Sequence, residues 1–187
     1  PAPDHGISHR IASFAHLKSG LILNLIPGGS YKMGDEDDVL RRPVQLMTVK
    51  PVLIGRFPVT QICWDKIGGE DFRSVLNPNS PINSMNWIEC LERLKRAGGG
   101  LRLPHEAEWE YACRAGSVGP YFWSSDNSGD MDRSYCWHGD HCDSDIPNEV
   151  VDVTLHFDSG KWNSFGLIYM SGNVSEMRQD KSHGKVV

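Results

Sequence analysis

The chain has 187 residues and a formal net charge of −5 at pH 7, and this length suits one domain with a sizeable core. Lysine and arginine form no run longer than pairs such as Arg41-Arg42, which argues against a nucleic acid partner because such partners require concentrated positive charge. The longest apolar run, from Leu21 to Ile26, is far too short to cross a bilayer. The N-terminus has no basic region followed by an apolar stretch, so no secretory signal is visible.

The chain contains five cysteines. An odd number argues against a full disulfide framework, and Cys63, Cys90 and Cys113 fall at apolar positions of helical patterns. This usage mildly favours reduced thiols and a reducing compartment. Cys136 and Cys142 share a loop, where they could be bonded to each other, bound to a metal, or free.

Alternating apolar residues predict an antiparallel β-sheet in the first third of the chain. Residues 1–20 show no clear period and are expected to form an N-terminal arm, with regular structure beginning at Leu21. A Pro-Gly-Gly turn at residues 27–29 predicts a hairpin between strands at 21–25 and 30–33. Segments 43–49 and 52–59 alternate in the same way and are expected to continue the sheet.

Three helices follow. Thr60 can cap a short helix that ends at Gly68-Gly69. Asn86 and Glu89 have the spacing of a capping box in front of an apolar stripe that ends at the Gly98-Gly99-Gly100 run. In the third case Pro104 interrupts a strand and predicts a helix from His105 to about Arg114, because proline lacks an N–H but suits a helix start. Beyond this helix the chain is expected to be dominated by loops as far as Phe165.

Several of these segments occur together, and in the same order, in one known family. They are IPGGSYKMG at 26–34, GRFPVTQ at 55–61, SMNW at 84–87, RLPHEAEWEYA at 102–112, NSFGL at 163–167 and MSGNV at 170–174. On these segments the chain resembles the formylglycine-generating-enzyme, or sulfatase-modifying-factor, family. The resemblance implies an α+β, C-type-lectin-like fold of small twisted antiparallel sheets, two or three helices and long irregular loops. It assigns residues 21–187 to one such domain.

The resemblance implies more than one function, because this fold carries cysteine oxidation to formylglycine, iron-dependent sulfoxide synthesis and non-catalytic display of ligand-binding loops. Relatives continue past the Gly-Asn-Val motif into a final stretch that holds the reactive cysteine pair of the formylglycine-generating enzymes. This chain reads Ser175-Glu176-Met177 at that point and ends at Val187. The domain is therefore expected to be incomplete at its C-terminus, and no cysteine here inherits the catalytic role.

The resemblance also implies a structural calcium ion near the Gly-Asn-Val motif. Asn173, the carbonyl of Val174 and Glu176 would supply the hard oxygen ligands that calcium prefers. The alternative is that Asn173 caps a turn and Glu176 faces solvent. Nearby, the family's Leu-Tyr-Asp-Met sequence is replaced by one in which Tyr169 stands at the position of the carboxylate.

A loop region and one single residue could also belong to a functional site. Residues 136–143 gather two cysteines and two histidines, which suggests zinc or copper, although the usual spacing of paired ligands is missing. Aromatic residues in loops on a firm frame suggest instead that Trp123, Trp137 and His138 line a ligand site. His105 replaces the family's helix-capping threonine and is either a weak cap or a site residue.

The leading interpretation is a non-catalytic sulfatase-modifying-factor-like domain that serves as a ligand-binding or display scaffold. The competing interpretation is a formylglycine-generating-type, cysteine-oxidising enzyme, or a related oxidase, whose catalytic end is absent from this chain. A third is an assembly subunit whose fold a partner chain completes, since unpaired sheet edges seek partners. The partner is otherwise an unknown protein or small molecule.

Overall fold

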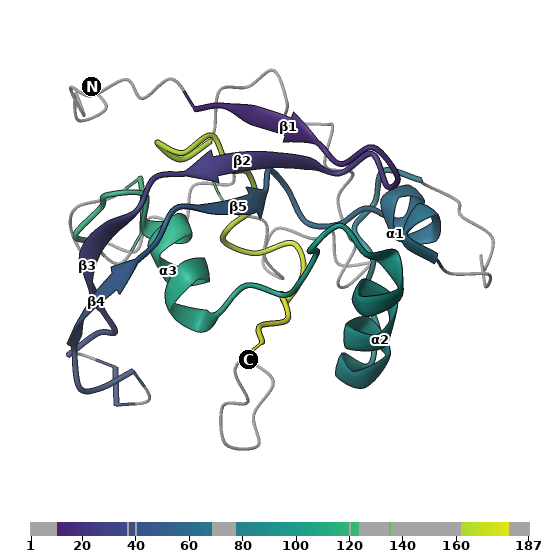
Figure 1. Cartoon of the computed structure of the whole chain (residues 1–187). Coiled ribbons are helices and arrows are strands. Elements are labelled where there is room, and N and C mark those ends of the chain that lie inside the picture. The colour runs from purple at the N-terminus through teal and green to yellow at the C-terminus, as the bar shows by residue number, and fades with distance from the viewer. Residues whose placement is uncertain are drawn as a thin grey trace.

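The computed structural model describes residues 11–36, 38–39, 41–68, 78–119, 121–123, 135 and 162–179. It contains small antiparallel sheets and three helices, and the segment 162–179 passes between them (Figure 1). The sheet elements are β1 (Ser13–Ala15), β2 (Ile22–Ile26), β3 (Gly29–Met33), β4 (Gln45–Val49) and β5 (Val52–Gly55). The helices are α1 (Gln61–Gly68), α2 (Trp87–Ala97) and α3 (Glu106–Arg114).

The hairpin expected between β2 and β3 is wrong. β2 pairs with β5, and β3 pairs with β4, so the four strands form one long bent ribbon in which β2 and β3 follow each other on the same side. The ribbon bends at Gly28 and Pro51, which lie directly against each other. A Cβ atom added at Gly28 would lie only 2.8 Å from Cδ of Pro51. The Pro-Gly-Gly sequence therefore marks a bend within the ribbon and not a chain reversal.

Regular structure also begins earlier than Leu21. Within the segment expected to be irregular, β1 adds an edge strand to β2, with Phe14 opposite Leu23. β1 escaped the sequence analysis because three residues are too few to show a period. The first sheet therefore has the order β1-β2-β5, and the second sheet is the pair β3-β4.

Helices α1 and α2 form where the capping residues predicted. The Thr60 hydroxyl accepts a hydrogen bond from the Cys63 N–H at 3.3 Å, and the Asn86 side chain accepts one from the Ile88 N–H at 2.8 Å. The two helices pack on each other and enclose one core cluster with Trp64 and Ile67 at its centre. No helix in the described ranges is long and apolar enough to span a bilayer.

Helix α3 starts after the predicted Pro104 corner. Both Glu108 carboxylate oxygens accept hydrogen bonds from Arg102 at 2.7 Å, and one also accepts from the His105 N–H at 2.8 Å. The helix packs on the β3-β4 pair, where the rings of Tyr31 and Tyr111 lie 5.4 Å apart. A second core cluster joins this helix to the sheet and to the segment 165–170; its buried members are Ile26, Ile54, Ala112, Ala115, Phe165, Leu167 and Met170.

Candidate functional site

The NSFGL motif is held in place by two buried asparagines. The Asn163 amide donates to the carbonyls of Ala112 and Cys113 at the end of α3, and its side-chain oxygen accepts from the N–H groups of Phe165 and Leu167. From β2, the Asn24 amide donates to the carbonyls of Phe165 and Gly166 at 3.0 Å. The loop is therefore fixed to both the helix and the sheet. The sequence analysis assigned neither asparagine this role.

The predicted calcium ligands lie in one turn beside α3. Asn173 has a left-handed backbone, with φ 65°, and the Val174 N–H donates to the Gly172 carbonyl at 2.9 Å. Glu176 turns inward, where its carboxylate accepts a hydrogen bond from Nε1 of Trp109. Burial raises the pKa of the Glu176 carboxyl above its ordinary value, and the hydrogen bond from Trp109 opposes this shift.

This carboxylate suits a cation. Within the described part of the chain, Trp109 is its one hydrogen-bond donor, so the partly buried carboxylate has a neutral group and no cation as its partner. No group of three His, Cys, Asp or Glu side chains that could hold a metal occurs among the described residues. A calcium site here would thus depend on carbonyl and amide oxygens, such as those of Asn173 and Val174, in addition to Glu176.

The chain that follows this turn is tied to the start of α3. Arg178 forms an ion pair with Glu106 at 2.6 Å, and its carbonyl accepts a hydrogen bond from Trp87 Nε1 at 2.9 Å. The Gln179 N–H donates to the Pro104 carbonyl at 2.9 Å. These contacts place the turn between α2 and α3, where Figure 1 shows the segment 162–179 descending.

The three described cysteines are free thiols, as their helical positions predicted. Cys63 and Cys90 are buried, and burial raises the pKa of the Cys90 thiol. Burial also raises the pKa of Cys113 to about 11, and its thiol donates to the Met170 carbonyl at 3.6 Å. Cys90 and Cys113 are therefore protonated at neutral pH, whereas a nucleophilic or copper-binding cysteine acts as a thiolate.

Trp123 lies in a stack of aromatic rings. Its ring is stacked on Tyr121, with centroids 4.8 Å apart, and on Tyr135 at 5.5 Å, and Phe122 meets it edge-on. Trp123 therefore contacts three other aromatic rings, and among the described residues its buried Nε1 has no hydrogen-bond partner. The other predicted ligand residues, Trp137 and His138, lie outside the described residues, as do Cys136 and Cys142.

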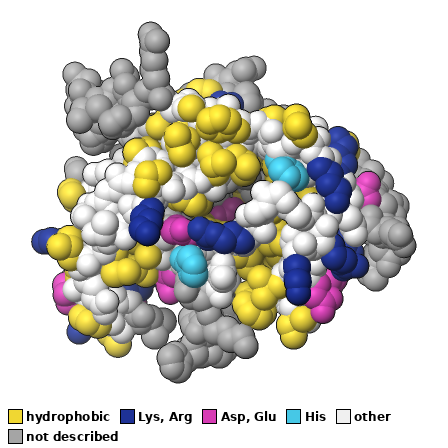
Figure 2. Space-filling view, viewed as in Figure 1, with side chains coloured by type: hydrophobic (Ala, Val, Ile, Leu, Met, Phe, Trp, Pro, Cys, Tyr) yellow, Lys and Arg dark blue, Asp and Glu magenta, His cyan; other side chains and the backbone are white. Residues whose placement is uncertain are grey.

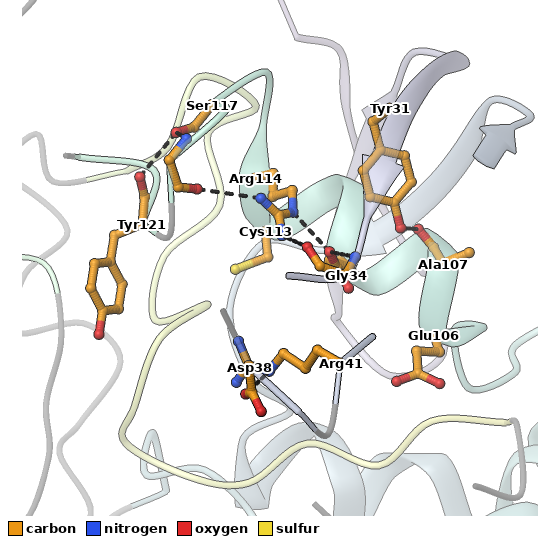
Figure 3. A network of polar contacts seen from close by, with 12 residues as sticks. Tyr31, Gly34, Asp38, Arg41, Glu106, Ala107, Cys113, Arg114, Ser117 and Tyr121 are labelled. Carbon is orange, nitrogen blue, oxygen red and sulfur yellow. Dashed lines mark hydrogen bonds and ion pairs between the residues drawn. The ribbon is translucent and has the colours of Figure 1, made fainter. Parts of the chain in front are cut away.

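Arg114 anchors the loop that leads into this stack (Figure 3). Its guanidinium donates to the Glu110 carboxylate at 2.8 Å, to the Gly34 carbonyl at 2.9 Å and to the Gly119 carbonyl at 3.3 Å. The Ser117 hydroxyl continues the network by donating to the Tyr121 carbonyl at 3.0 Å. The role of Arg114 could not be predicted from the sequence, because only the fold brings residue 34 to the end of α3. His105, by contrast, is exposed at the helix start.

The protein is an α+β protein of the C-type-lectin-like fold, as predicted. It combines a bent antiparallel ribbon with three helices and a long segment that returns between them. The family model for the sulfatase-modifying factor enzyme 1-like domain matches residues 18–186. The chain therefore belongs to this family.

Three similar proteins show how wide the family is. The formylglycine-generating enzyme of Mus musculus is 30% identical over 125 residues, which are 66% of this chain and 33% of the enzyme. The inactive C-alpha-formylglycine-generating enzyme 2 of Bos taurus is 25% identical, and the match covers 86% of this chain and 71% of that protein. The structure of PvdO from Pseudomonas aeruginosa has a TM-score of 0.65 and 26% identity, covering 85% of this chain and 70% of that one. This chain thus spans about a third of the length of the mouse enzyme.

Proposed function

We propose that this chain is a non-catalytic sulfatase-modifying-factor-like domain that displays loops for ligand binding. The observation that carries the proposal is the stack of Tyr121, Trp123 and Tyr135, which the Arg114 network fixes to α3. Loops with aromatic residues on a firm frame are typical of binding sites. The predicted ligand residues Trp137 and His138 come two and three positions after Tyr135 in the sequence, and the proposal includes them in the ligand-binding loops.

The second candidate is a cysteine-oxidising enzyme, which the similarity to formylglycine-generating enzymes favours. The described thiols argue against an enzyme that uses them. Burial raises the pKa of Cys90 and of Cys113, so both thiols stay protonated at neutral pH.

A cysteine-containing peptide of the kind that formylglycine-generating enzymes oxidise separates the two candidates. The chain is incubated with this peptide, copper and oxygen, and the peptide product is analysed by mass spectrometry. We expect no conversion to formylglycine, while the mouse enzyme converts the peptide in parallel as the positive control. Conversion by the 187 residues alone would refute the scaffold proposal, and repeating it with each of the five cysteines replaced in turn by Ser would then identify the thiol involved.

We further propose that Asn173, Val174 and Glu176 bind a calcium ion that stabilises the turn after the MSGNV motif. The support is the partly buried Glu176 carboxylate, whose pKa is raised because its charge is held away from water without a cation beside it. A bound cation would remove this cost and hold the turn against α3.

The variant Glu176→Gln tests the calcium proposal. Gln keeps an oxygen to accept the Trp109 N–H but carries no charge, so in EGTA the variant should melt at the same temperature as the wild type or higher. Calcium should then raise the melting temperature of the wild type and leave that of the variant unchanged. Glu92→Gln on the exposed side of α2 is the matched control and should respond as the wild type does. Equal responses of wild type and Glu176→Gln would contradict the site.

A further inference from the structure

The sheet β1-β2-β5 has an apolar outer face. Phe14, Leu25 and Leu53 are exposed on it by 50%, 38% and 44%, and Figure 2 shows hydrophobic side chains gathered over these three strands. The strand registers place the residues of this face in two rows. One row runs Ala12, Leu25, Leu53 and the other runs Phe14, Leu23, Gly55. We call these six residues the outer array.

The outer array differs from an ordinary solvent-facing sheet surface. An antiparallel sheet with one wet face alternates apolar and polar residues, yet β2 is apolar on both sides, since Ile26 is fully buried inward while Leu25 faces outward. The cluster around α1 and α2 covers Leu21 and touches Leu23, but it leaves Leu25 exposed. Segments 11–15, 21–29 and 51–55, which build this face, contain no charged residue. Both properties are typical of a surface that another apolar surface covers.

The arrangement of large and small side chains indicates what that second surface is. The large residues Phe14 and Leu53 occupy one diagonal of the array, the small residues Ala12 and Gly55 occupy the other, and leucines fill the centre. Suppose that two copies face each other across a two-fold axis that lies in the plane of this face and runs either along β2 or perpendicular to it. The diagonal of large residues in one copy then lies over the diagonal of small residues in the other. Each large residue of one copy then meets a small residue of the other, as interdigitating layers require.

We propose that the outer array is a self-association surface on which a second copy of this chain packs face to face. Its lack of charge lets two molecules of net charge −5 approach here without local repulsion. The array contributes six residues per partner, fewer than the about 20 to 30 of a standard interface. The dimer is therefore weak and reversible, with a dissociation constant on the order of 10 µM.

Sedimentation equilibrium of the full chain, from about tenfold below to about tenfold above that constant, tests the proposal. The average mass of the wild type should rise from 20.9 kDa towards twice that value. Leu53→Lys places a charge in the array and should weaken association at least about tenfold, because it buries an unpaired charge. Leu46→Lys is the matched control, since Leu46 is 76% exposed on β4, outside the array, and its association should equal that of the wild type.

Far-UV circular dichroism and a thermal melt establish that each variant is folded. If Leu53→Lys does not fold, Phe14→Ser on the edge strand takes its place, with the same expected loss of association. A wild type that stays monomeric over the whole range overturns the proposal and leaves the face to a different protein. Dimers that Leu53→Lys and Phe14→Ser do not weaken overturn it as well.

Discussion

Replacing Asn163 by Ala is expected to lower the free energy of unfolding by about 3 to 5 kcal/mol. The Asn163 side chain is buried and makes four hydrogen bonds to backbone groups, two at the end of α3 and two within its own loop. Ala removes all four at once and leaves these backbone groups without partners. Each buried group so stranded costs about 1 to 3 kcal/mol, reduced where water enters the space. Since whole domains are stable by only about 5 to 15 kcal/mol, the variant should be barely folded.

Urea unfolding followed by far-UV circular dichroism measures this loss. Asn83→Ala is the matched control, because Asn83 is exposed in the loop before α2, and it should change stability by less than about 0.5 kcal/mol. A loss below about 1 kcal/mol in Asn163→Ala would mean that the loop 163–167 does not depend on this side chain.

The helices could be predicted from the sequence because their signals are local. Thr60, Asn86 and Pro104 each act on backbone groups a few residues away, and each capping or corner role occurs where it was predicted. Strand pairing is different, because a strand's partner need not be its neighbour in the chain. Ile26 pairs with Val52 and Gly29 with Val49, and nothing in the segment 26–29 specifies those distant residues.

The candidate site shows the same division. Glu176 could be selected from its motif, but its partner Trp109 lies in a helix that was predicted from the Pro104 corner, with no contact to residue 176 foreseen. Three glutamates lie along α3. In the structure they contact separate segments: Glu106 pairs with Arg178, Glu108 pairs with Arg102, and Glu110 accepts a hydrogen bond from the Gly34 N–H. Charges at a helix start are predictable from sequence, whereas the segments they hold depend on the fold.

Replacing Arg114 by Leu is expected to lower the free energy of unfolding by about 2 to 3 kcal/mol. The guanidinium is largely buried and is the donor that links α3 to the Gly34 and Gly119 carbonyls. Leu fills part of the space but donates nothing, so two carbonyls and the Glu110 carboxylate lose a partner. The Gly34 N–H still donates to the Glu110 carboxylate at 2.9 Å. The loss of stability is therefore smaller than for a buried charge that keeps no partner.

The Arg114→Leu variant should also disturb the aromatic stack, because Gly119 and the Ser117 contact to Tyr121 lie on the loop that Arg114 holds. Near-UV circular dichroism, which reports the fixed packing of tyrosine and tryptophan rings, should weaken at temperatures where the far-UV signal is intact. Arg96→Leu on the exposed side of α2 is the matched control and should change neither signal. A full near-UV signal in folded Arg114→Leu would show that the stack of Tyr121, Trp123 and Tyr135 holds itself together without α3, and its support for a display scaffold anchored by Arg114 would then be lost.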